Sequence, residues 1–72
     1  MAHYVAVPVA DDGSDRTDAE ARAATVSGDY VSVANFRRYA FARRSTLPGQ
    51  YNLYLVEGVG RRVLLCMLYR TV

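Results

Sequence analysis

The sequence contains one cysteine, one histidine and no tryptophan. The single cysteine, Cys66, excludes an intrachain disulfide, and with His3 as the only histidine no zinc site built from these two residue types can form. The longest apolar run, residues 63–69, is far shorter than the ~20 residues that span a bilayer, and the N-terminal residues lack the pattern of a signal peptide. We therefore expect a cytoplasmic protein that uses no metal or cofactor.

Lysine is also absent, so all nine basic residues are arginine. A GC-rich coding sequence accounts for this bias, but arginine also suits planar, bidentate contacts with carboxylates, phosphates and bases. The charges are unevenly distributed: residues 1–29 carry six acidic residues and two arginines, a net charge of −4, and residues 30–72 carry seven arginines and one acidic residue, a net charge of +6. Such a dipolar chain favours oriented binding to a charged partner, unless its two parts neutralise each other.

With 72 residues, 51% of them hydrophobic, the chain predicts a single small domain over residues 1–72. A domain of this size buries only ~60% of the surface that its unfolded chain exposes, so its stability is small unless something else supports it. Because a disulfide and a zinc site are excluded, a second subunit or another partner is the expected support.

Two segments favour strands and a third is ambiguous. Residues 4–10 alternate between valines and other side chains, and Pro8 favours a place at a sheet edge or at the end of the strand. The β-branched and aromatic content of residues 29–34 predicts a second strand. Residues 36–44 match neither the strand nor the helix period, and both structures stay open for them.

A helix is expected over residues 17–26. Thr17 and Glu20 have the spacing of a capping box, and Ser27-Gly28 is a suitable end for the helix. Its buried stripe should consist of small side chains that allow close packing on a sheet, namely Ala19, Ala23 and Val26.

The C-terminal part of the chain predicts a β-hairpin. Leu47-Pro48-Gly49 is typical of a turn, and residues 51–57 and 61–71 read as strands joined by a short glycine-containing loop. Together with the preceding elements this predicts an α+β fold: a small antiparallel sheet of three to four strands, with one or two helices packed on one face.

The last strand has apolar residues on both faces. An unbroken alternation places Val63, Leu65, Met67 and Tyr69 on one side and the leucines and cysteine between them on the other. One small alanine-rich helix cannot cover both faces. A second helix from residues 36–44, a second copy in a homodimer, or a different partner is needed.

Candidate catalytic groups are scarce, and we expect no enzyme. His3, the only histidine that could activate a nucleophile, lies in a stretch that we expect to be mobile, and Cys66 lies in an apolar strand typical of a core position. Residues 11–15 are acidic, but their glycine comes too early for a calcium loop, so a solvated turn is the expectation. Gly58 and Gly60 precede a strand and not a helix, which favours a hairpin loop over a phosphate loop.

The stretch of residues 37–44 has two pairs of arginines around Tyr39 and Phe41. As a strand it would form a stacking platform with cationic edges for single-stranded nucleic acid. Arg37, Tyr39, Ala40 and Phe41 resemble the RNP1 segment of RNA-recognition-motif proteins, although Arg38 stands where that motif has glycine and Arg44 where it has an aromatic residue. The resemblance implies RNA binding on a sheet.

Two other interpretations of this stretch are open. Its aromatic residues could fill the core beneath a solvated arginine face, or its arginines and tyrosine could anchor another protein. We favour a small regulatory or inhibitory protein that acts by protein–protein binding, of the kind that phages and other mobile elements encode, with nucleic-acid binding as the alternative. The candidate binding residues are Arg37, Arg38, Tyr39, Phe41, Arg43, Arg44, Arg61 and Arg62.

Overall fold

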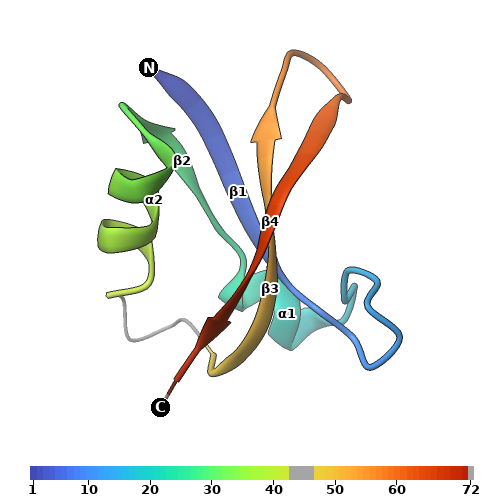
Figure 1. The fold of residues 1–72 in the computed structure, drawn as a ribbon. Helices are drawn as coiled ribbons and strands as arrows, with labels where there is room; N and C mark the ends of the chain where they lie inside the picture. Colours follow the sequence, from blue (N-terminus) through green and yellow to red (C-terminus); the bar gives the residue numbers. More distant parts are fainter. Residues whose placement is uncertain (43–46, 72) are drawn as a thin grey trace.

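The computed structural model describes residues 1–42 and 47–71 and has an α+β fold (Figure 1). All neighbouring strands are antiparallel, and the four-stranded sheet has the order β2-β1-β3-β4. The elements in chain order are β1 (Ala2–Pro8), α1 (Ala19–Ala24), β2 (Val26–Tyr30), α2 (Val33–Ala40), β3 (Gly49–Val56) and β4 (Arg62–Arg70).

β1 lies in the interior of the sheet, between β2 and β3. Pro8 therefore does not mark an edge strand; it is the last residue of β1, where it pairs with Tyr51 and the strand ends. β3 and β4 pair side by side, and residues 57–61 connect them. Gly58 and Gly60 have positive φ values of 83° and 73°, which glycine adopts more easily than any other residue.

The core lies on one face of the sheet, here called the covered face. Tyr4, Ala6, Val26, Tyr51 and Leu53 project from this face, and Phe36 and Ala40 of α2 pack on them. The rings of Tyr4 and Phe36 are stacked with their centroids 5.4 Å apart. Figure 1 shows α2 beside β2 and β1, away from β4, so the helix covers mainly one half of the sheet.

The predicted first helix is shorter than expected. Its N-cap is Asp18 and not Thr17, because the Asp18 carboxylate accepts a hydrogen bond from the Ala21 amide. The Arg16 guanidinium donates two further hydrogen bonds to that carboxylate, from Nε at 2.9 Å and from Nη2 at 2.8 Å. Aspartate caps a helix as well as threonine does, and the arginine fixes it in place. The buried helical residues are Ala21 and Ala24, which replaces the expected stripe.

The predicted strand over residues 29–34 is displaced toward the N-terminus. β2 spans Val26–Tyr30 and includes Ser27-Gly28, which we expected to end the helix. Ser32 then caps α2, with its hydroxyl accepting a hydrogen bond from the Asn35 amide at 3.2 Å. A serine cap followed by Val33, Phe36 and Ala40 at helical spacing makes this segment a helix.

Residues 36–44 were left open between strand and helix, and the structure answers this for the residues that it describes. Residues 36–40 are helical, and Phe41 is the C-cap. Arg43 and Arg44 lie outside the described residues.

The Asp18 cap predicts a specific acid sensitivity. The hydrogen bond from Arg16 lowers the pKa of Asp18 from 3.8 to about 2. A carboxylate with a lowered pKa in the folded protein stabilises it above pH 3.8, and this stabilisation is lost as the pH falls toward 2. Asp18→Asn should lower the melting temperature at pH 5, and the difference between the two proteins should shrink as the pH falls from 3.8 through 2; a difference that stays constant over this range would contradict the prediction.

Candidate binding surface along β4

β4 forms one edge of the sheet and exposes large apolar side chains. Because β3 is its only neighbour in the sheet, the far side of its backbone has no strand partner in the described chain. Val63, Leu64, Leu65, Met67 and Tyr69 are between 38% and 69% exposed. Natural edge strands are usually short or carry inward charges or prolines, which hinder pairing with other chains. β4 spans nine residues and has charges only at its two ends.

A β-bulge changes which side chains share a face of β4. Leu53 pairs with Cys66 and Tyr54 with Leu64, so Leu65 is an extra residue between these two pairs. The expected unbroken alternation is therefore wrong. On the covered face lie Val63, Cys66 and Leu68; on the opposite face, here called the open face, lie Leu64, Met67 and Tyr69.

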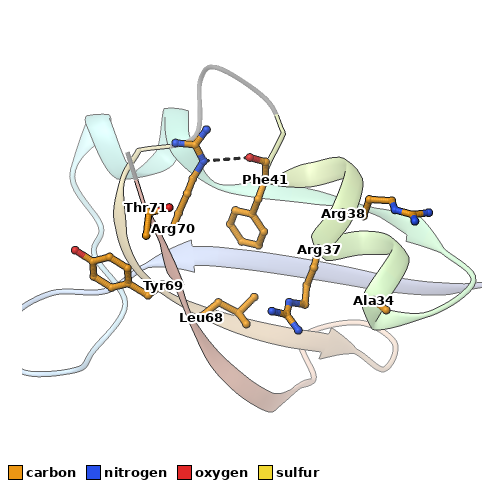
Figure 2. A pocket seen from close by; sticks show the side chains of 8 residues that line it. All are labelled: Ala34, Arg37, Arg38, Phe41, Leu68, Tyr69, Arg70 and Thr71. Atoms are coloured by element: carbon orange, nitrogen blue, oxygen red, sulfur yellow. Dashed lines mark hydrogen bonds between the residues drawn. The ribbon is translucent and has the colours of Figure 1, made fainter.

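A groove of about 440 Å³ lies between α2 and the C-terminal end of β4. In Figure 2 the Arg37 side chain extends from α2 toward Leu68, and the Phe41 ring points into the same space. The Arg70 guanidinium donates a hydrogen bond through Nε to the Phe41 carbonyl at 3.1 Å, which joins β4 to the end of α2. The groove thus combines an apolar lining with arginine.

The predicted site residues on α2 have different roles. Arg37, Arg38 and Tyr39 are exposed, and the Tyr39 ring stacks on Tyr30 with centroids 6.2 Å apart. Phe41 packs edge-on against the core rings of Phe36 and Tyr51 at 6.4 and 5.1 Å. The strand platform of Tyr39 and Phe41 expected for nucleic acid is therefore wrong, because these residues belong to a helix and its cap. Nucleic-acid binding itself stays a prediction from the sequence.

The other two predicted arginines lie at the start of β4 and just before it. Arg61 is exposed, and none of the ion pairs found within the described chain involves it. The Arg62 guanidinium lies over the Tyr54 ring at 4.4 Å and is 3.4 Å from the Asp15 carboxylate. The structure therefore does not bring together the six predicted residues that it describes: Arg37, Arg38 and Phe41 line the groove, whereas Arg62 contacts residues on the open face.

Asp15 belongs to a polar cluster that the sequence does not reveal. Its carboxylate accepts hydrogen bonds of 2.9 Å from the Asn52 amide and from the Tyr54 hydroxyl. Burial and the hydrogen bond from its hydroxyl to Asp15 raise the pKa of Tyr54. The expectation of a fully solvated acidic turn is wrong for Asp15, which attaches the loop after β1 to the open face of β3. The contacts span more than 35 residues of sequence, and no local pattern predicts them.

His3 and Cys66, which the sequence offers as candidate catalytic groups, lie on different strands, β1 and β4. No group of three or more His, Cys, Asp or Glu side chains in the described part of the chain is placed to hold a metal ion. Cys66 is half-buried against the core, and His3 contacts Asp29 at 2.6 Å on the exposed ends of β1 and β2.

Comparison of the chain with protein-family models, curated proteins and solved structures finds no match. Within residues 1–42 and 47–71, none of the helices has the length and apolar character needed to cross a bilayer.

Proposed function

We propose that this chain is a small non-enzymatic regulatory or inhibitory protein that acts by binding another protein through β4 and the arginines beside it. The observation that carries the proposal is the exposed apolar strand at the edge of the sheet. Contiguous exposed apolar surface on a small protein marks an interaction site more often than scattered apolar residues do. A cytoplasmic location belongs to the proposal, because the unpaired Cys66 suits a reducing compartment.

The apolar residues of β4 supply the binding free energy in this proposal. Leu64, Met67 and Tyr69 project together from the open face, and Leu65 lies at the bulge beside them. Burial stabilises by about 25 cal/mol per Å² of apolar surface, so several such side chains form the centre of an interface. An unpaired strand edge also offers backbone groups for pairing with an added strand.

The arginines around β4 supply orientation. Arg37, Arg38 and Arg61 are exposed, and none of the ion pairs within the described chain uses them. Exposed charges of one sign steer a complementary partner and speed its association. Because arginine is enriched at binding hot spots, these residues suit the rim of a protein interface.

The test compares substitutions on one hairpin. Leu64→Lys combined with Met67→Lys should reduce the affinity for the native partner at least tenfold, because charges then enter the centre of the interface. Val59→Lys is the matched control, since Val59 is fully exposed in the loop between β3 and β4. Affinity capture with the wild-type protein, followed by quantitative mass spectrometry, identifies the partner, and titration calorimetry measures each variant.

Circular dichroism must first show that both variants keep the fold. Capture of the same proteins in equal amounts by the wild type and by the β4 variant would refute the proposal. Loss of capture with Val59→Lys as well would show that added charge, and not the β4 surface, decides binding.

A further inference from the structure

We propose that the partner presents an acidic extended segment, which adds to β4 as a strand and places a carboxylate in the groove beside Arg37. This inference rests on the proposed function and specifies the chemistry of the partner. Three features carry it: the unpaired edge of β4, the charges at the two ends of that strand, and the groove at its C-terminal end.

The edge of β4 accepts an extended segment more readily than a helix. Nine consecutive residues are already in strand conformation, and their outer side faces no other strand of the described chain. No proline or glycine interrupts the strand, and its single irregularity is the bulge at Leu65. An added strand pairs with the backbone and places alternate side chains on each face.

The charges of β4 disfavour a second copy of this chain as the added strand. β4 begins at Arg62, directly after Arg61, and ends at Arg70. A two-fold antiparallel pair centred on Cys66 would set the Arg62 end of each strand against the Arg70 end of the other, and like charges facing each other across strands are destabilising. Asp15 pairs with Arg62, but Arg61 adds a second positive charge at that end, so β4 is basic at both ends and apolar between them. Its complement is acidic at both ends and apolar between them.

The groove gives the carboxylate at one end a defined receptor. The Arg37 side chain extends into the space toward Leu68, with the Phe41 ring pointing into the same groove (Figure 2). Arg37 takes part in none of the ion pairs within the described chain, so its guanidinium is available to an incoming anion. Arginine binds carboxylates with two parallel hydrogen bonds, which gives the contact a defined geometry.

The test uses a fluorescein-labelled peptide matched in length to the nine residues of β4. Its centre alternates valine and threonine, and its two ends are glutamates; the control peptide has glutamine in place of every glutamate. Fluorescence polarisation with the full chain should show that the glutamate peptide binds roughly tenfold more tightly. Raising the salt concentration should reduce this difference, because exposed charges are screened.

Variants then assign the effect to the groove. Arg37→Ala should weaken binding of the glutamate peptide about fivefold and leave the glutamine peptide unchanged. Arg22→Ala is the matched control, because it removes the same charge from an exposed position in the last turn of α1. Equal effects of the two substitutions would show that only net charge matters and would overturn the assignment to the groove.

Two other outcomes overturn the inference. The first is that the glutamate peptide does not bind, or binds no more tightly than the glutamine peptide. If capture of the native partner still depends on Leu64 and Met67 in that case, the inference fails while the proposed function stands. The other is a stable dimer in sedimentation at micromolar concentration that Leu64→Lys dissociates, because a second copy would then cover β4.

Discussion

Phe36→Ala is expected to unfold the protein at room temperature. Phe36 is 0% exposed and is one of the largest fully buried side chains, with ring contacts to Tyr4, Tyr30 and Phe41. Truncation of a buried phenylalanine to alanine costs about 3–5 kcal/mol, because transfer free energy is lost and a cavity remains. A core in a chain of this length supplies only about 3–5 kcal/mol of net stability. The cost of the substitution is therefore about as large as the whole free energy of unfolding.

Urea denaturation followed by circular dichroism checks this expectation. The variant should lack a cooperative transition, while Phe36→Leu, which refills most of the space, should retain one with a lower midpoint. Tyr39→Ala is a second control on the same helix, because Tyr39 is more than half exposed. A Phe36→Ala protein that unfolds cooperatively within about 1 kcal/mol of the wild type would show that α2 contributes little to the core.

The position of α2 relates this core to the proposed binding surface. α2 packs chiefly against β2, at the opposite edge of the sheet from β4, and α1 contacts β1. Neither helix therefore covers β4 as closely as α2 covers the core residues, and the apolar residues of β4 stay partly exposed. A substitution in β4 and one in the core should consequently have separable effects: loss of binding in one case and loss of folding in the other.

The sequence predicts β1, β3 and β4 better than it predicts the segment between β1 and β3. Residues 4–8, 51–56 and 62–70 are strands close to their predicted ranges, because alternation and β-branched content are local properties. β2 was misplaced because Ser27-Gly28 reads as a helix end. The glycine instead leaves room for the Tyr30 ring, since an added Cβ at Gly28 would lie 2.9 Å from Tyr30 Cε2. Pairing with β1, which is a tertiary effect, makes this segment a strand.

The candidate site was also predicted only in part, because its arrangement depends on tertiary structure and not on local sequence patterns. The excess of apolar side chains in residues 63–69 indicated an uncovered strand, and the exposure of β4 agrees with it. The bulge at Leu65 reassigned the faces, and period-2 reasoning has no means to foresee it. The groove combines α2 with the end of β4, about 30 residues later. A basic, aromatic stretch can be recognised from the local sequence, but the tertiary fold determines which of its arginines faces a groove.

Asp15→Ala should have the second largest effect on stability, about 2–3 kcal/mol. The substitution removes the acceptor of the Asn52 amide, whose residue is only 5% exposed, and of the Tyr54 hydroxyl. A buried donor that loses its partner costs about 1–3 kcal/mol. Without Asp15 the Asn52 amide keeps only a long hydrogen bond of 3.4 Å to the Gly13 carbonyl, while the half-buried Tyr54 hydroxyl loses its acceptor. Asp15→Ala also detaches the loop that follows β1 from the surface of β3, so the loss of stability should appear in global unfolding.

Two variants separate these contributions in urea denaturation. Asp11→Ala removes the same charge from an exposed position in the same loop and should change the free energy of unfolding by less than about 0.5 kcal/mol. Asp15→Asn keeps one carbonyl acceptor and should lose about half as much stability as Asp15→Ala. If Asp15→Ala were as stable as Asp11→Ala, water would be replacing the carboxylate as the partner of Asn52 and Tyr54, and the loop would not hold the open face of the sheet.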